Sequence, residues 1–247
     1  MHQFSNGKKV FFLYPPQNFS KTIIKRIFKD GFEIYKLNST ERLLPLLQKY
    51  PDSILFINTD YPYDDNFNFN TFNEIELSKK IFENLKVYTF FMEKVSYGDK
   101  ILDYISLERS DEEVYSDIYK ILDEAEAHGK REFVRYGNYN EILSSISFTC
   151  DKNVYKTNMH DISPKALSFS SDDDLDRLIE SSFSDMRLKV GVYEITVVGR
   201  IVTSRMIGDK KIYIAEFEAD ESKKDEIFDF IFTSLEKGMD EIIHSLS

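Results

Sequence analysis

Hydrophobic residues are spaced in two different ways along the chain, and the spacing changes near residue 128. Between residues 8 and 127, short apolar runs alternate with segments in which apolar residues recur every three or four positions. The runs KKVFFLY, FEIYKL, SILFIN and KVYTFFM are typical of buried strands, and the intervening segments are typical of helices. Strands that alternate with helices form parallel sheets with helical crossovers. We therefore expect a three-layer α/β sandwich over residues 1–127.

The helices of this half are marked by their apolar stripes and by their end signals. The last one begins with Ser110 and Glu113, which have the spacing of a capping box, and Gly129 is placed to end it in a left-handed conformation. Gly31 is placed to end the first one. The expected helices cover residues 18–30, residues 39–50 with Pro45 disturbing the start, residues around 75–85, and residues 110–127.

Beyond residue 128 the apolar residues recur at every second position. The runs EILSSISFTC, NVYKTNM, ALSFS, MRLKVGVYEITVVGRIVTSRM and KKIYIAEFE are separated by turn formers, such as residues 151–153 and 208–209. Antiparallel strands with short turns predict a small barrel or sandwich over residues 128–247. A final helix begins near Ser222, with Ser222 and Asp225 as its caps, and its apolar stripe either closes the barrel or pairs with another chain.

Composition restricts the location and the partners of the protein. The chain of 247 residues has a formal net charge of −11, and its single cysteine, Cys150, cannot form an internal disulfide. A lone cysteine suits a reducing compartment. No segment reaches the roughly 20 apolar residues of a membrane span. We expect a cytoplasmic protein without a membrane span, and the acidic balance argues against DNA binding.

Enzymatic and metal-binding patterns are weak. The histidines show no metal-ligand spacing, and no phosphate-binding glycine loop or nucleophile elbow is present. The segment SSDDDLD, residues 170–176, lacks the glycine and the final glutamate of a calcium loop. We therefore expect a non-enzyme without a metal or a cofactor.

One short basic cluster stands out in this acidic chain. Lys130, Arg131 and Arg135 lie in GKREFVRYG, at the joint between the two halves, and 26 residues after Arg135 comes DISPKALSF. The R-x-x-x-R loop followed by D-x-S-x-x-A resembles the signature of the PilZ domain, R-x-x-x-R and D-x-S-x-x-G, over about residues 129–240. The resemblance implies a six-stranded antiparallel barrel with a terminal helix, which binds the bacterial second messenger cyclic di-GMP.

The resemblance also assigns roles to individual residues. Arg131 and Arg135 would hold the phosphates and guanines, because guanidinium forks pair with both. Asp161 would accept the guanine N1 and N2 hydrogens, and Ser163 would add a hydroxyl contact. Ala166 replaces the family's glycine, and its methyl group is tolerated only if its φ is negative. Lys130 would assist with phosphate, and Arg200 either lines the same face or points to solvent.

Residues 8–127 resemble a response-regulator receiver domain in the order of their elements. The acidic residues that hold Mg²⁺ in receivers are missing, since Tyr14, Pro15 and Pro16 follow the first strand, and Asn58 ends the third strand where the phosphoacceptor belongs. We expect a pseudo-receiver that serves in docking or dimerisation. The alternative is a receiver phosphorylated on Asp60.

The combined reading is a non-catalytic cyclic di-GMP receptor. Ligand would draw the 129–137 loop onto the barrel and re-orient the domains, and the resemblance implies a protein target, with the motility machinery as one example. The alternative is a protein-interaction module with a PilZ fold that no longer binds nucleotide.

Overall fold

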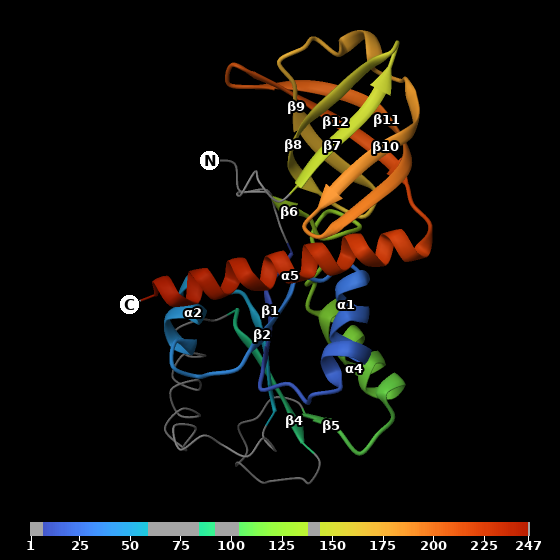
Figure 1. Ribbon diagram of the computed structural model, residues 1–247. Coiled ribbons are helices and arrows are strands. Elements are labelled where there is room, and N and C mark those ends of the chain that lie inside the picture. Colours follow the sequence, from blue (N-terminus) through green and yellow to red (C-terminus); the bar gives the residue numbers. More distant parts are fainter. Residues whose placement is uncertain (1–6, 59–83, 92–103, 138–143, 247) are drawn as a thin grey trace. The chain divides into compact units, whose positions relative to one another are not determined.

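The computed structural model describes residues 7–58, 84–91, 104–137 and 144–246. The chain divides into two compact units, one of Met1–Val134 with Glu236–Ser247 and the other of Arg135–Leu235. Figure 1 labels their helices and strands. We describe each unit by itself.

The first unit is built on a parallel sheet. Its strands lie in the order β2-β1-β3-β4-β5, with each neighbouring pair parallel. The four predicted strands are confirmed, whereas β5 was not predicted because its three residues give no hydrophobic pattern. The strands are β1 (Val10–Leu13), β2 (Ile34–Leu37), β3 (Ile54–Asn58), β4 (Lys86–Phe91) and β5 (Tyr104–Ser106).

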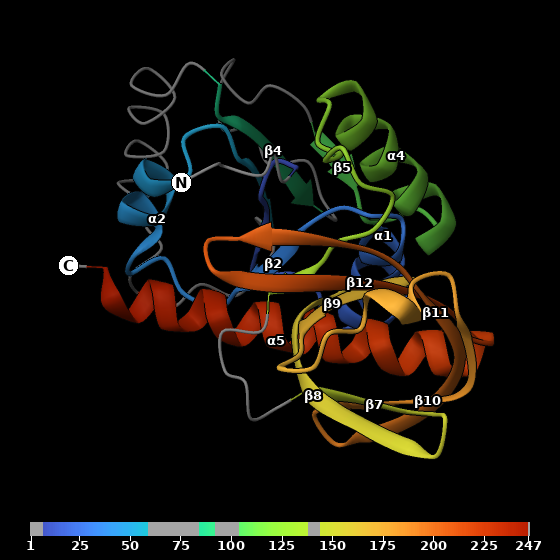
Figure 2. The same cartoon turned by 90° about the horizontal axis from the view of Figure 1, so that it is seen from above.

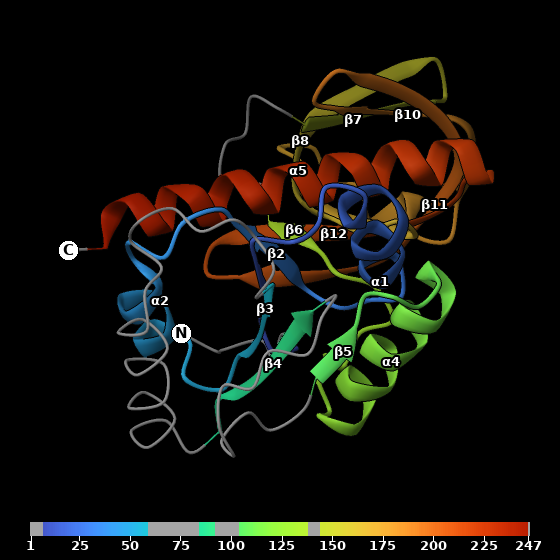
Figure 3. The ribbon, with the colours of Figure 1, turned by 90° about the horizontal axis from the view of Figure 1, so that it is seen from below.

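Helices cover both faces of this sheet, as the prediction of a three-layer α/β unit requires. The guanidinium of Arg26 lies 3.6 Å from the ring centre of Tyr115, so α1 and α4 share one face. Figure 3 shows α2 on the opposite face. The helix predicted around residues 75–85 falls almost entirely outside the described residues. The helical segments are a π-helical turn η1 (Ser20–Ile24), α1 (Lys25–Lys29), α2 (Leu43–Lys49) and α4 (Asp111–Glu124).

Two of the helix ends predicted from the sequence are formed by the expected residues. Gly31 follows α1 with a φ of +95°, and the capping box of Ser110 and Glu113 is formed at the start of α4. Both predictions are confirmed. The prediction that Gly129 is left-handed is wrong, because Glu126 takes that conformation with a φ of +51°.

The early end of α4 has a physical cause. The amide of Ala127 donates to the carbonyl of Leu122 at 2.9 Å, and that of Glu126 donates to Asp123 at 2.9 Å. These two bonds form a Schellman motif, in which an apolar residue after the left-handed one packs back onto the helix. Ala127 is fully buried. Because burial of Ala127 stabilises this motif, the helix ends before Gly129, the residue that the sequence favoured as its end.

The second unit is a closed antiparallel barrel of six strands. The order β8-β7-β10-β11-β12-β9 is completed by pairing of β9 with β8, and the short strand β6 (Tyr136–Gly137) adds to β8. The prediction of a barrel is confirmed, and the closed ring is seen from above in Figure 2. Its strands are β7 (Ser144–Cys150), β8 (Asn153–Ile162), β9 (Ala166–Ser170), β10 (Ser182–Val190), β11 (Tyr193–Ile207) and β12 (Lys210–Glu218), with a 3₁₀ turn η2 (Asp176–Leu178) between β9 and β10.

Helix α5 (Glu221–Ser245) follows the barrel, and its first part packs against it. The ring of Phe230 meets that of Tyr136 edge to face, with centroids 5.6 Å apart, and it also lies beside the turn at Gly191. Ile227 and Ile231 are fully buried. This part of the stripe therefore covers the barrel residues that surround Phe230.

The predicted caps of α5 are wrong. Asp220 precedes the helix, and its Oδ1 accepts from the amide of Lys223 at 3.0 Å. That backbone hydrogen bond lowers the pKa of Asp220. Ser222 and Asp225 instead lie inside the helix. The true cap lies one residue before the first helical position, where its side chain reaches the free amides.

The last part of α5 belongs to the first unit. The Nη1 of Arg42 donates to the carbonyl of Ile243 at 2.8 Å and also to that of His244, and Lys36 pairs with Glu236 at 3.1 Å. A cation at these carbonyls satisfies groups that the helix end leaves without intrahelical partners. Within the described residues, no helix combines the length and hydrophobicity needed to cross a membrane.

Candidate functional site

Three side chains of the second unit form one hydrogen-bonded cluster. The Nη1 of Arg135 lies 3.2 Å from the Oδ1 of Asp161, and the hydroxyl of Ser168 donates to the Oδ2 of Asp161 at 2.6 Å. The side chains of Arg135 and Asp161 are 29% and 26% exposed, whereas Ser168 is buried. The cluster thus places a guanidinium and a carboxylate at the barrel surface, and the carboxylate is hydrogen-bonded to the buried hydroxyl of Ser168.

Strand register explains why these residues meet. Tyr136 and Gly137 of β6 pair with Ile162 and Asp161 of β8, which brings the preceding Arg135 beside Asp161. The pairing of β8 with β9 shifts between Met159 and Asp161, and Asp161 then faces Ser168. A shift of this kind is a β-bulge, which re-aims the side chains that follow it. The bulge near His160 therefore sets the direction of Asp161.

The turn between β8 and β9 holds the remaining barrel residues of the motif. The amide of Ser163 donates to the carbonyl of Ala166 at 2.8 Å, and its hydroxyl accepts from the amide of Ala166 at 3.1 Å. Ser163 is buried, and its hydroxyl also lies 3.0 Å from the Ala166 carbonyl. The hydroxyl of Ser163 therefore stabilises the turn in this structure.

Alanine at position 166 fits the backbone. Ala166 begins β9, and it is not among the described residues with positive φ. An L-residue is strained only in the positive region, so the methyl group adds no backbone strain here. The condition stated from the sequence, that alanine is tolerated at position 166 if its φ is not positive, is therefore met.

Lys130 and Arg131 fall in the first unit, whereas Arg135 falls in the second. Lys130 and Arg131 are both exposed. Their segment is packed rather than free, because a Cβ on Gly31 would overlap the carbonyl of Glu132, and the ring of His128 lies 3.7 Å from that of Phe32. The first unit therefore fixes the backbone on either side of Arg131.

Arg200 is the other arginine singled out by the sequence. It is exposed on β11 and lies 3.1 Å from Glu216 and 3.7 Å from Glu180. Its charge is therefore already opposed by two exposed carboxylates.

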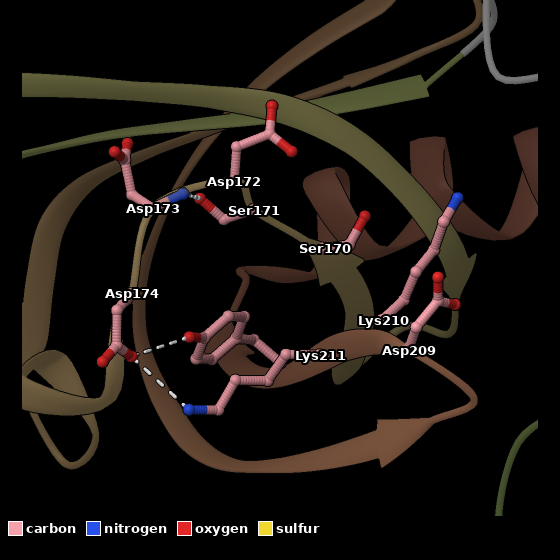
Figure 4. A pocket seen from close by; sticks show the side chains of 9 residues that line it. Ser170, Ser171, Asp172, Asp173, Asp174, Asp209, Lys210 and Lys211 are labelled. Atoms are coloured by element: carbon pink, nitrogen blue, oxygen red, sulfur yellow. Dashed lines mark hydrogen bonds and ion pairs between the residues drawn. The ribbon is translucent and has the colours of Figure 1, made fainter.

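Residues 170–174 of the acidic segment line a cavity of about 350 Å³, together with residues 209–211 and Tyr213, as Figure 4 shows. Lys211 lies 3.4 Å from Asp174 and also contacts Asp176, and the hydroxyl of Tyr213 lies 3.4 Å from Asp174. The pKa of Asp174 is lowered, chiefly by the backbone amide of Asp176. Among the described residues, no cluster of three or more His, Cys, Asp and Glu side chains is arranged to hold a metal ion. A lysine therefore already opposes the charge of this cavity.

Ser168 belongs to the hydrogen-bonded cluster but was not predicted from the sequence. It lies two positions after Ala166, beyond the end of the motif. The available signal was the hairpin: because β8 and β9 are adjacent and antiparallel, a residue soon after the turn must face Asp161. The exact partner depends on the bulge, which the sequence pattern does not reveal.

Comparisons with known proteins give structural similarities only. No family model and no curated protein matches the chain. The chain is similar to YcgR from Escherichia coli in complex with c-di-GMP, with 10% identity and a TM-score of 0.40 over 49% of this chain and 52% of that one. It is also similar to the PilZ domain of YcgR with c-di-GMP, with 11% identity and a TM-score of 0.38 over 47% of this chain and 98% of that one.

A third similarity is to the Bacillus subtilis inhibitor of motility, MotI/DgrA. Identity is 13% and the TM-score is 0.33, over 42% of this chain and 50% of that one. The chain therefore matches about half the length of YcgR and of MotI/DgrA.

Proposed function

We propose that the second unit is a PilZ domain and that the protein is a non-catalytic receptor for cyclic di-GMP. The observation that carries the proposal is the pairing of Arg135 with Asp161 at the barrel surface, at 3.2 Å. These two residues come from the two halves of the sequence motif, 26 positions apart, and strand pairing brings them together. The site would comprise Arg131, Arg135, Asp161, Ser163 and Ala166, with Lys130 assisting.

The chemistry of the cluster suits a nucleotide with guanine bases and phosphates. Guanidinium groups pair with phosphate and with the O6 and N7 atoms of guanine, and a carboxylate accepts from the guanine N1 and N2 hydrogens. Arg135 lies against one oxygen of Asp161. Ligand binding would exchange or share that contact, with a phosphate or guanine acceptor taking the guanidinium and the guanine N–H groups donating to the carboxylate. An ion pair that remains partly exposed to solvent is held less strongly than a fully buried one, so the exchange is feasible.

Binding is tested by isothermal titration of the full chain with cyclic di-GMP, with GTP as the control. We expect saturable heat with cyclic di-GMP and none with GTP at the same concentration. Absence of heat at tens of micromolar cyclic di-GMP would instead favour the alternative, a PilZ-fold interaction module that does not bind nucleotide.

The proposed signalling role involves both units of the chain and a protein partner. We propose that ligand draws the loop carrying Arg131 onto the barrel, so that the units change orientation and a protein partner is engaged, with motility machinery as one candidate. A switch of this type needs contacts that differ between bound and free states. The loop offers such a difference because Arg131 and Arg135 stand on opposite sides of the division between units. We place this receptor in the cytoplasm, without DNA as a partner.

For the first unit we propose a receiver-like domain that does not take phosphate. Its sheet order places the ends of β1 and β3 side by side, and the amide Nδ2 of Asn58 donates to the carbonyl of Tyr14 at 2.9 Å. Asn58 is buried and offers an amide where a phosphoacceptor would need a carboxylate. Asp60 lies outside the described residues.

Phosphorylation of the first unit is tested by incubation with acetyl phosphate and Mg²⁺, followed by intact-mass measurement. We expect no mass increase of one phosphoryl group. An increase that disappears in Asp60→Asn would show a phosphorylated receiver and contradict the proposal.

A further inference from the structure

Ser168 supports the carboxylate of Asp161 through a buried hydroxyl on the neighbouring strand. Its hydroxyl donates to the Oδ2 of Asp161 at 2.6 Å, while Arg135 lies against the Oδ1 atom. Ser168 is 2% exposed, whereas the side chain of Asp161 is 26% exposed. The carboxylate is thus held by a buried donor on one oxygen and approached from the surface at the other.

A hydroxyl in this position cannot be replaced by solvent without cost. Because Ser168 is buried, its removal is not readily compensated by bulk water and leaves one carboxylate lone pair of Asp161 without its partner. The surface side of the same carboxylate remains open to Arg135. The orientation of the group then depends on Arg135 alone, which is itself partly exposed.

We propose that Ser168 is a positioning residue for nucleotide recognition, which fixes the plane of the Asp161 carboxylate so that its accessible oxygens face the ligand. This inference rests on the proposed function. It assigns a role in the proposed binding site to Ser168, which lies outside the sequence motif. A carboxylate that is already oriented loses less conformational freedom when the ligand binds. The hydrogen bond of Ser168 supplies that orientation before the ligand arrives.

The test compares Ser168→Ala with Ser144→Ala. Ser144 is also buried in the barrel, and among the described residues its hydroxyl has no hydrogen-bond partner. Ser144→Ala therefore removes a buried hydroxyl without touching Asp161. Isothermal titration with cyclic di-GMP should show Ser168→Ala about fivefold weaker than wild type, because the hydrogen bond is formed before binding and only its orienting effect on Asp161 is lost from the affinity. Ser144→Ala should bind like wild type.

A second readout does not need the ligand. Three-bond couplings measured by NMR in the ligand-free protein report the χ1 rotamer of Asp161. We expect one rotamer in wild type and in Ser144→Ala, and averaging between rotamers in Ser168→Ala. If Ser168→Ala does not fold, Ser168→Cys keeps the branching pattern of serine with a larger and weaker donor, and its affinity and couplings should then lie between those of wild type and full loss.

The outcomes separate the two claims. A Ser168→Ala protein with wild-type affinity, or with a single Asp161 rotamer, overturns the positioning role. If wild type shows no binding while Ser168→Ala shows rotamer averaging, the proposed function fails and the positioning of Asp161 by Ser168 stands.

Discussion

Replacing Arg135 by alanine is expected to weaken cyclic di-GMP binding by about 10- to 100-fold, the loss of one charge-assisted hydrogen bond. Arg135 is the motif arginine that the structure places beside Asp161. Its removal deletes a contact to the nucleotide and also leaves the Asp161 carboxylate without its cation. Titration calorimetry of wild type and variant measures the ratio of dissociation constants directly.

Two further variants sharpen this prediction. Arg177 is an exposed arginine of the same barrel that donates to the hydroxyl of Tyr155 at 3.2 Å, so Arg177→Ala removes the same charge without touching Asp161. Its affinity should equal that of wild type. Arg135→Lys keeps the charge but loses the planar fork, and it should fall between wild type and Arg135→Ala.

Thermal unfolding provides the control for the fold. Arg135 and Asp161 both keep contact with solvent, and ion pairs near the surface typically contribute about 1 kcal/mol or less to stability. The unfolding midpoint of Arg135→Ala should therefore stay close to that of wild type. Wild-type affinity in Arg135→Ala would remove Arg135 from the site.

The largest stability effect is expected for Gly31→Ala. Gly31 has a φ of +95°, and a Cβ there would overlap the backbone carbonyl of Glu132. Backbone strain of this kind costs about 1–3 kcal/mol, and the overlap with a carbonyl adds to it because backbone cannot rotate away as a side chain can. Denaturant unfolding should show a lower free energy of unfolding than wild type, and the segment with Arg131 should shift.

Gly238→Ala is the matched control. Gly238 lies within α5, and a Cβ there would meet no described atom within 4 Å. Alanine in a helix interior is favoured over glycine by roughly 0.5–1 kcal/mol, so this variant should be slightly more stable than wild type. Equal stability of Gly31→Ala and wild type would show that Glu132 does not pack against Gly31.

Much of the fold follows from the hydrophobic pattern. Strands such as Ile54–Asn58 are uniformly buried, and the alternating burial of Tyr193–Ile201 matches its period of two. Buried positions require apolar residues, so the uniform and the alternating burial of these strands both appear as hydrophobic patterns in the sequence. The turn at residues 151–152, where both residues have positive φ, was equally predictable from its turn formers.

Features that depend on long-range packing were not predictable. The left-handed residue after α4 is Glu126 and not Gly129, because burial of Ala127 decides where the chain turns. The division of α5 between two units also has no local signal, since the partner of Glu236, Lys36, lies 200 residues earlier in the chain and the partner of Ile243, Arg42, lies 201 residues earlier.

The candidate site was predictable in part. Arg135 and Asp161 were named from the motif, and the structure brings them together. Ser168 was missed because its contact depends on a bulge in β8, and the hydroxyl of Ser163 proved to stabilise the turn. A sequence motif indicates which residues can bind a ligand. The hydrogen bonds that hold those residues in place depend on how the strands pair, which the motif does not show.

The central claim, that the barrel binds cyclic di-GMP through the Arg135 and Asp161 surface, is tested most directly by calorimetric titration of wild type beside Arg135→Ala and Arg177→Ala. The account predicts saturable binding in wild type and in Arg177→Ala, with binding about 10- to 100-fold weaker in Arg135→Ala. No binding in wild type, or the same affinity in all three proteins, would contradict it.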